Sequence, residues 1–242
     1  MRLVILSLMV ATVAQATDVT VCGQTLHGGE IGELTANLDC GGAPVVGVMM
    51  QAGSTLHMNG HSLTTAAIGV GTDPGKKGGP VTRITGPGAI TGMTGCAIFA
   101  SNKISVQSVD LHDNGCGIMS VYTFPNTLED VSIAANTGDG VNYVSTVGNG
   151  RIKGERVTVT DNGGVGLRSS GKITLEDAVV TGNVTAGVVS TAKSILVRNG
   201  TLTGNGSGGD VAAFRRSRLV DSTCDHSVDL RNGGSLGICS LD

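Results

Sequence analysis

Asp110, His112 and Arg168 are of the residue types that acid–base chemistry requires. Asp110 and His112 flank Leu111 in an alternating segment, so both side chains are expected on the outward face of one strand. Arg168 is expected to project from a strand further along the chain. We take the three as candidate catalytic residues, because neighbouring carboxyl and imidazole groups can transfer protons. The alternative is that they are solvated surface side chains.

Three glutamates form a second candidate site. Glu129, Glu155 and Glu176 each lie seven residues before an asparagine of the repeat described below. Equal offsets in a repeat predict that the three carboxylates stack in neighbouring units. Stacked carboxylates can hold Ca²⁺, which prefers oxygen ligands, so we take these residues as candidate metal ligands and expect no other cofactor.

Basic residues form a row parallel to the glutamates. Lys103, Arg151 and Lys172 each lie eleven residues before an asparagine of the repeat. Arg156 and Arg198 interleave with the acidic column. The alternative to a metal site is therefore a solvated turn in which the acidic and basic rows partly neutralise each other.

Aromatic residues are too few for a broad sugar-stacking platform. The chain has no Trp, two Tyr and three Phe. Tyr122 and Tyr143 are expected near each other on successive units, and they are the candidate binding residues for a carbohydrate. A binding surface built from polar side chains is the alternative, because solenoids offer long flat faces.

A repeat of about 22 residues organises all these positions. Its anchors are spaced by 22, 26, 21 and 22 residues. Two short alternating segments precede each anchor, and a glycine followed by an aliphatic residue comes after most of them. Three strands per unit predict an all-β solenoid of parallel strands, with about 8–9 coils. The anchors are Asn114, Asn136, Asn162, Asn183 and Asn205.

The anchor asparagines have a structural explanation of their own. Asn tolerates the left-handed backbone region that tight turns need. Stacked Asn side chains also form hydrogen bonds along a column. We therefore predict a structural ladder, and the alternative is a sugar or ion site made from the same residues.

The coil pattern over residues 50–215 resembles the pectin-lyase-like superfamily of right-handed parallel β-helices. Residues 56–63, LHMNGHSL, resemble an early-coil motif of that superfamily. The resemblance implies a single-stranded right-handed β-helix in a secreted branch. The superfamily includes pectate lyases, polygalacturonases, alginate epimerases and phage tailspikes. The Asp-Asp and Gly-His-Gly motifs of polygalacturonases are absent here, and so is the Arg-x-x-Pro-x-x-Arg pattern of pectate lyases, so the resemblance carries no activity.

Both ends of the chain break the repeat. We expect coils over 51–215, an N-terminal cap over 17–50 and a C-terminal cap over 216–242, all in one domain. Caps are needed because open solenoid ends expose unpaired strand edges. The chain thus forms a capped solenoid.

The six cysteines are predicted to form three disulfides. Cys96 and Cys116 precede Ile98 and Ile118 by the same distance, so they occupy equivalent places in adjacent coils, with Cα atoms about 5 Å apart. An even number of cysteines is typical of exported chains. The pairs predicted to staple the caps are Cys22–Cys40 and Cys224–Cys239.

The first residues have the pattern of an export signal. A charged start, an apolar run over 3–13 and the small-x-small sequence Ala14-Gln15-Ala16 predict cleavage after Ala16. We therefore expect a secreted or periplasmic protein without a membrane span, whose mature chain begins at residue 17. The formal net charge of −3 gives no support for a nucleic-acid partner.

The sequence favours a binding protein over an enzyme, because no catalytic motif accompanies the regular repeat. The first hypothesis is a secreted β-helix that presents a binding surface to a polysaccharide or a cell-surface partner. One alternative is a small lyase or epimerase acting on a polyuronate, which would use the charged columns. The other is a purely structural surface protein.

Overall fold

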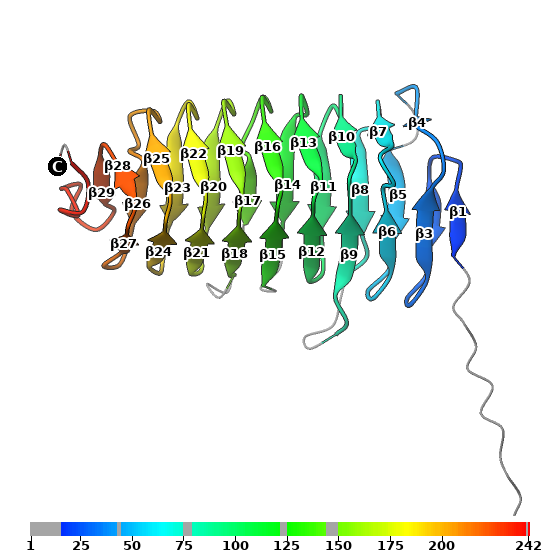
Figure 1. The fold of residues 1–242 in the computed structure, drawn as a ribbon, viewed down its shortest axis with the longest axis horizontal. Helices are drawn as coiled ribbons and strands as arrows, with labels where there is room; N and C mark the ends of the chain where they lie inside the picture. Colours follow the sequence, from blue (N-terminus) through cyan, green and yellow to red (C-terminus); the bar gives the residue numbers. More distant parts are fainter. Residues whose placement is uncertain (1–15, 43–44, 75–78, 122–124, 144–149, 241) are drawn as a thin grey trace, which may run out of the picture.

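The chain winds into an elongated solenoid whose turns stack along one axis (Figure 1). The fold comes from a computed structural model. The expected export signal, 1–16, lies almost wholly outside the residues that the structure describes. The described residues are 16–42, 45–74, 79–121, 125–143, 150–240 and 242.

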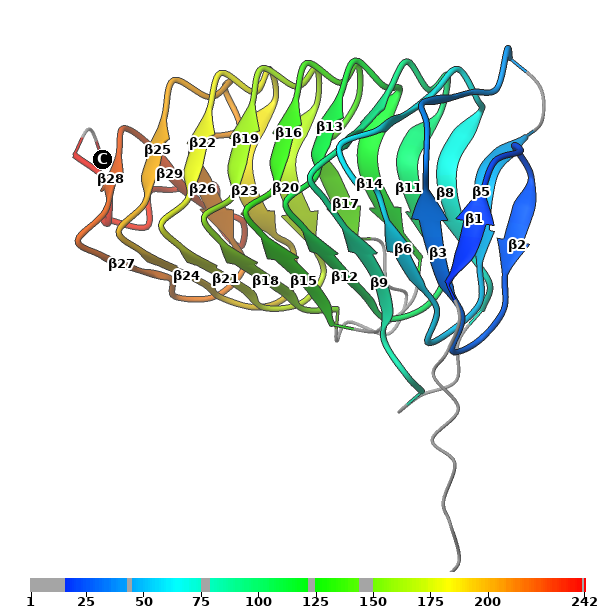
Figure 2. The ribbon, with the colours of Figure 1, turned by 45° about the vertical axis from the view of Figure 1, so that its right-hand side comes forward.

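Three parallel sheets run along the solenoid as its three faces (Figures 1 and 2). Sheet A contains β1 (Thr17–Val19), β3 (Ile31–Leu34), β6 (Thr55–His57), β9 (Thr82–Thr85), β12 (Ile104–Gln107), β15 (Asn126–Glu129), β18 (Ile152–Glu155), β21 (Ile173–Glu176), β24 (Ile195–Arg198) and β27 (Arg218–Val220). Sheet B contains β2 (Gln24–Leu26), β5 (Val46–Met50), β8 (Ile68–Thr72), β11 (Cys96–Ala100), β14 (Cys116–Ser120), β17 (Val141–Tyr143), β20 (Val165–Ser169), β23 (Ala186–Ser190), β26 (Val211–Ala213) and β29 (Ser227–Asp229). Sheet C contains β4 (Leu38–Asp39), β7 (Ser62–Thr64), β10 (Ala89–Thr91), β13 (Asp110–His112), β16 (Ser132–Ala134), β19 (Thr158–Thr160), β22 (Val179–Thr181), β25 (Thr201–Thr203) and β28 (Thr223–Cys224).

One coil takes one strand from each sheet, in the order A, C, B along the chain. Strand pairing confirms the predicted register, as Ile133 pairs with Val159 and Val159 pairs with Val180. All three side chains are fully buried. Stacking thus gives each coil the apolar core that it cannot form alone, over about eight turns of roughly 22 residues.

The predicted asparagine ladder is present in the turns between sheets C and B. The left-handed backbone expected of the anchor asparagines belongs instead to the residue before each anchor, as at Asp161. Asn162 shows the pattern: its side-chain amide donates to the carbonyl of Ile133 at 3.1 Å and to Oδ1 of Asn183 at 2.9 Å. Its own Oδ1 accepts from Nδ2 of Asn136 at 2.8 Å. Because all rungs except the half-buried last one are buried and every rung is paired, the ladder fixes the register of successive coils.

The ladder ends on a carboxylate that the sequence analysis missed. Asp210 is buried, and its Oδ1 accepts from the backbone N and the Nδ2 of Asn205, at 3.1 and 2.7 Å. Its Oδ2 accepts from the backbone N of Asp225 and of His226, at 2.9 and 3.0 Å. A chain of amides that all donate in one direction needs a final acceptor, and an ionised Asp supplies four lone-pair sites.

The coils extend beyond the limits expected at residues 51 and 215. Strands β3 and β5 pair with β6 and β8, and β27 continues sheet A from β24. The repeat continues there because inward apolar positions persist, as at Leu26 and Leu34. The sequence pattern missed these coils because their turns lack the anchor asparagine.

The three predicted disulfides are present. Cys22–Cys40 joins the first coil to the second, and Cys96–Cys116 joins neighbouring strands of sheet B with Cα atoms 4.3 Å apart. Cys224–Cys239 holds the C-terminal segment against the last coil, with Cα atoms 4.9 Å apart. Disulfides of this kind indicate an extracytoplasmic location.

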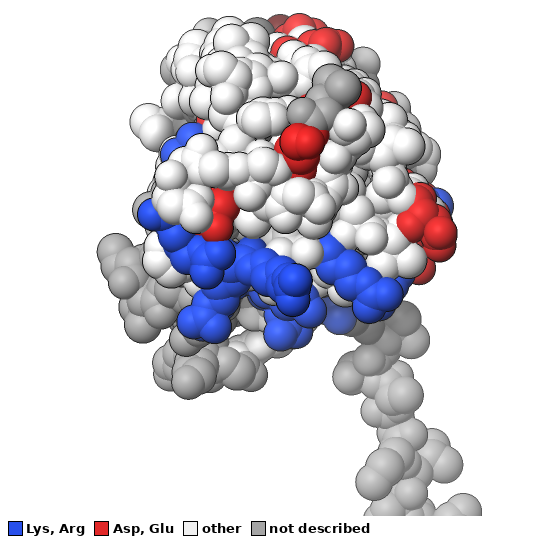
Figure 3. Space-filling model, turned by 90° about the vertical axis from the view of Figure 1, so that its left-hand side faces the viewer, with Lys and Arg blue, Asp and Glu red and all other residues white. Residues whose placement is uncertain are grey.

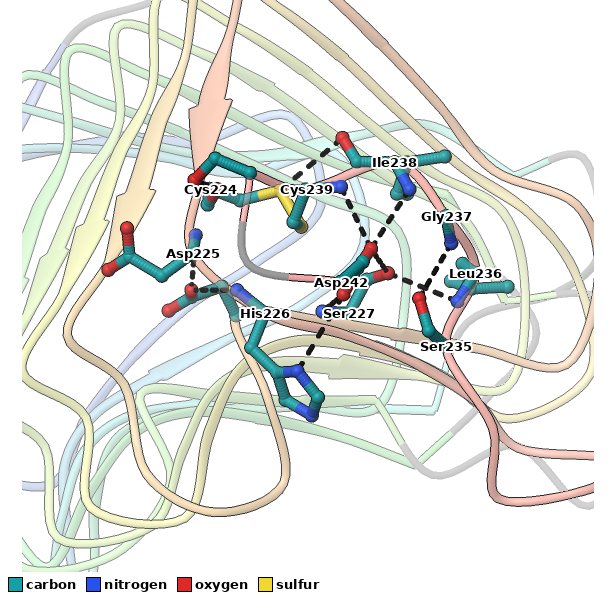
Figure 4. The surroundings of a disulfide bond; sticks show 12 residues. Cys224, Asp225, His226, Ser227, Ser235, Leu236, Gly237, Ile238, Cys239 and Asp242 are labelled. Carbon is teal, nitrogen blue, oxygen red and sulfur yellow. Dashed lines mark hydrogen bonds and ion pairs between the residues drawn. A yellow bond between two sulfur atoms is a disulfide. The ribbon is translucent and has the colours of Figure 1, made fainter.

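Asp242 ties the C-terminal segment beside the last disulfide (Figure 4). Its side chain is 3% exposed and accepts hydrogen bonds from the backbone N of Ser227, Ile238 and Cys239. Burial opposes ionisation of this carboxyl, but the hydrogen bonds from Ser227, Cys239 and Ile238 outweigh burial and hold its pKa well below the usual value. The last coil is thereby closed by a charged staple next to a covalent one.

Candidate functional site

The turns between sheets B and A carry a row of cations near the C-terminal end. Arg151 directly precedes β18 and Lys172 directly precedes β21. Ile152 pairs with Ile173, so the two cations stand at the same place in adjacent coils. The sequence analysis predicted this row, and the following coils extend it with Lys193 and Arg215.

Two hollows that share lining residues lie along this row. One has a volume of about 300 Å³ and the next about 570 Å³, and Ser194 and Arg215 line both. Figure 3 shows that Lys and Arg side chains gather in a band on the C-terminal side of the molecule. We call this feature the basic groove, and its cationic residues are Arg151, Lys172, Lys193, Arg215, Arg216 and Arg231.

Two buried serines lie beneath the turns of the basic groove, and Gly171 lines it. Ser190 Oγ donates to the carbonyl of Gly171 at 2.8 Å, and Ser169 Oγ donates to the carbonyl of Gly150 at 3.3 Å. A Cβ at Gly171 would lie only 1.1 Å from the Gly150 carbonyl oxygen. Successive turns therefore stack closely here, and they hold the cations in line.

Most cations of the basic groove have no carboxylate partner within the described part of the chain. Arg231 is the exception, because Nη2 lies 2.6 Å from Oδ2 of Asp229. Hydrogen bonds from Arg231 lower the pKa of Asp229 to about 2. The other five cations form no ion pair among described residues, so their donors are available to a ligand.

The glutamate column is in register, as predicted. Glu129 pairs with Glu155, and Glu155 pairs with Glu176. Arg156 lies among these carboxylates, with Nη2 2.8 Å from Oε1 of Glu129 and Nε 2.5 Å from Oδ1 of Asp130, and it also bonds Glu155. Hydrogen bonding to Arg156 lowers the pKa of Asp130. The column is therefore an ion-pair cluster in which a guanidinium occupies the place considered for Ca²⁺.

No other candidate metal centre is present among the residues that the structure describes. There, no three His, Cys, Asp or Glu side chains gather as metal ligands would. Arg198 of β24 stands beside Glu176 of β21 in the strand register, so a second cation follows the acidic column. Charge compensation thus explains the acidic column.

The three candidate catalytic residues do not come together. Asp110 and His112 lie on β13 in sheet C, whereas Arg168 lies on β20 in sheet B. His112 Nδ1 lies 2.8 Å from Oδ2 of Asp113, and Arg168 Nε lies 3.7 Å from Oδ2 of Asp139. The structure thus places these residues in two separate surface clusters.

Tyr143 is a correction to the predicted binding residues. Its side chain is 1% exposed, because it shares the inward face of β17 with Val141. Burial raises the pKa of Tyr143 to about 12. A buried ring cannot stack on a sugar, so this prediction was wrong, and Tyr122 lies outside the described residues.

Phe214 is the aromatic residue that the sequence analysis missed. It is 43% exposed and lines the larger hollow of the basic groove, next to Arg215 and Arg216. The available signal was the Phe-Arg-Arg run at a turn between two strands. Such a run places an apolar ring and two cations together outside the core.

The chain matches a known family and several solved structures. Residues 47–202 match the family model described as right handed beta helix region. No curated protein shows significant sequence similarity to the chain. Across the described residues, no helix has the length and hydropathy that a membrane crossing requires.

Solved structures share the fold at low identity. The A-module of the Azotobacter vinelandii mannuronan C-5 epimerase AlgE4 has a TM-score of 0.55 and 13% identity, over 89% of this chain and 78% of its own. Pectate lyase Pel9A has a TM-score of 0.54 and 13% identity, over 91% and 68%. The Dettilon tailspike protein has a TM-score of 0.53 and 12% identity, over 90% and 55%. At this identity the likeness shows the fold alone.

Proposed function

This chain belongs to the right-handed β-helix family, and we propose that it is an extracytoplasmic protein that binds a polysaccharide on the outside of its solenoid. The observation that carries the proposal is the basic groove, whose two hollows follow one another along successive coils and share lining residues. A groove that runs from coil to coil fits an extended polymer better than a small molecule. The named polysaccharides of two structural neighbours, mannuronan and pectate, agree with this ligand class.

Binding without catalysis is the form of the proposal that the geometry supports best. Proton abstraction next to a carboxylate needs a base and a cation at one place. Asp110 and His112 are instead on a different sheet from Arg168. In the acidic column that an epimerase or lyase would use, Arg156 pairs with Glu129, Asp130 and Glu155.

A glycan array probed with the purified full chain tests the proposed function. We expect binding to extended polysaccharides and little binding to mono- or disaccharides, because only a polymer spans several coils. Absence of binding to any glycan would contradict the proposal and favour a purely structural role. Release of unsaturated or epimerised product from a bound polymer would instead favour the lyase or epimerase alternative.

A further inference from the structure

We propose that the basic groove binds an anionic polysaccharide, a linear glycan that carries carboxylate or sulfate groups, with its chain along the solenoid axis. The inference rests on the proposed function and names its ligand class. It depends on three features of the groove: the spacing of its cations, their lack of partners, and the exposed ring of Phe214.

The cations are spaced for a polymer with regularly repeated charges. Coils stack about 4.8 Å apart, so each coil from Arg151 to Arg216 adds at least one cation to the row. The pairing of Ile173 with Ile195 places Lys193 and Ser194 in the coil after Lys172. A row over four coils spans about 14 Å, which a single small anion does not fill.

The unpaired cations require an explanation that the rest of the chain does not provide. The whole chain has a net charge of −3, and like charges side by side are unfavourable. At the glutamate column, by contrast, Arg156 is matched by Glu129, Asp130 and Glu155. Guanidinium groups form paired hydrogen bonds with carboxylate and similar planar or tetrahedral anions. The groove therefore has the charge of a site whose anions come from outside.

Phe214 favours a glycan over a nucleic acid. Its exposed ring stands in the larger hollow with Arg215, Arg216 and Arg231, where it can pack on the apolar face of one sugar. Proteins that hold single-stranded nucleic acids instead use several aromatic rings, one for each of successive bases. Among the described residues that line the groove, Phe214 is the one aromatic side chain.

The test uses isothermal titration of the full chain with polygalacturonate, dextran sulfate and unsubstituted dextran. The groove variant carries Arg151→Gln, Lys172→Gln and Arg215→Gln. We expect binding of at least one anionic polymer, little binding of dextran, and about a tenfold or greater loss of affinity in the variant. The two anionic arms distinguish carboxylate from sulfate as the recognised group.

A matched control removes three exposed cations outside the groove, by Arg83→Gln, Lys153→Gln and Arg198→Gln. The control has the same net charge as the groove variant, so equal losses in both would overturn the assignment of the groove. Circular dichroism verifies that both proteins are folded. Phe214→Ala provides a second test, in which affinity falls while the salt dependence of binding stays the same.

The remaining outcomes separate the inference from the proposed function. Equal binding of dextran and the anionic polymers, unaffected in the groove variant, would overturn the inference and leave polysaccharide binding intact. Binding of no glycan at all would overturn both. Tighter binding of single-stranded DNA than of either anionic polymer would overturn the choice of a glycan.

Discussion

The turns at the two ends of the sheet B strands differ in how their polar groups are paired. In the turns between sheets C and B, the asparagine ladder pairs its amides within the chain and ends on Asp210. In the turns between sheets B and A, Lys172 and Arg215 line the basic groove, and neither cation has an ion-pair partner among described residues. The first set of turns is complete by itself, and for the second set we propose a ligand that binds the cations.

The difference shows how the fold separates stability from binding. A buried ladder tolerates little change, because each lost rung leaves a neighbour unsatisfied. The connections from sheet B to sheet A range in length from three residues, 101–103, to nine, 73–81. This variation in length leaves the register of the ladder unchanged. The predictions below test this separation, from the largest expected effect to the smallest.

Asn162→Leu is expected to have the largest effect on stability. The substitution removes the side-chain donor to the carbonyl of Ile133 and the acceptor of the backbone N of Asn136 in the core, and it leaves Asn136 Nδ2 with one acceptor instead of two. We expect a loss of about 3–5 kcal/mol in the free energy of unfolding, measured by urea denaturation. Thr160→Val, on the outward face of β19, is the control and should change the value by less than about 0.5 kcal/mol. A loss no larger than that of the control would show that the ladder does not hold the coils.

Asp210→Asn is expected to have the next largest effect. An amide cannot accept all four hydrogen bonds that the carboxylate receives from Asn205, Asp225 and His226. We expect a loss of about 2 kcal/mol in the same urea measurement. The exposed Asp221→Asn removes the same charge and should leave stability nearly unchanged. Equal values for the two variants would contradict the role of Asp210 as the end of the ladder.

Acid is expected to weaken the C-terminal coil through Asp229. Because the folded pKa of Asp229 is lowered to about 2 from 3.8 by its hydrogen bonds with Arg231, its contribution is complete above pH 3.8. The contribution is lost as the pH falls toward about 2. Asp229→Asn should therefore reduce the pH dependence of the free energy of unfolding in this window. An unchanged pH profile would show that the pair with Arg231 does not stabilise the fold.

Arg156→Gln is expected to have the smallest effect on stability. It tests whether Arg156 neutralises the acidic column. The variant leaves Glu129, Asp130 and Glu155 without their shared cation. We expect added Ca²⁺ to raise the melting temperature of the variant by about 2 °C and to leave the wild type unchanged. Scanning calorimetry with and without Ca²⁺ measures both. A wild type that responds as strongly as the variant would contradict the neutralisation of this column by Arg156.

The sequence predicted the architecture well because a repeat reports three-dimensional neighbours directly. Equal offsets from the anchor asparagines placed Glu129 beside Glu155 and Cys96 beside Cys116, as the strand pairing shows. Side-chain direction was predicted less well at the end of a short strand. Tyr143 lies two residues after Val141, so it points inward with it.

The functional site was harder to predict because it depends on turns that the repeat does not specify. Equal offsets from the anchor asparagines placed Arg151 and Lys172 in one row. Phe214 and Arg231 instead come from segments where the anchor asparagine is missing. Whether these two residues meet depends on how the last coil closes. Pairing between distant charges, such as Arg156 with Asp130, likewise required side-chain geometry.

The separation of stability from binding is tested most directly by the salt dependence of polygalacturonate binding. It is measured for the wild type and for the Arg151→Gln, Lys172→Gln, Arg215→Gln variant. Each cation that contacts the polymer steepens the fall of affinity with salt. The account predicts a clearly shallower slope for the variant at an unchanged free energy of unfolding. Equal slopes for the two proteins, or a variant that binds poorly only because it is unfolded, would contradict it.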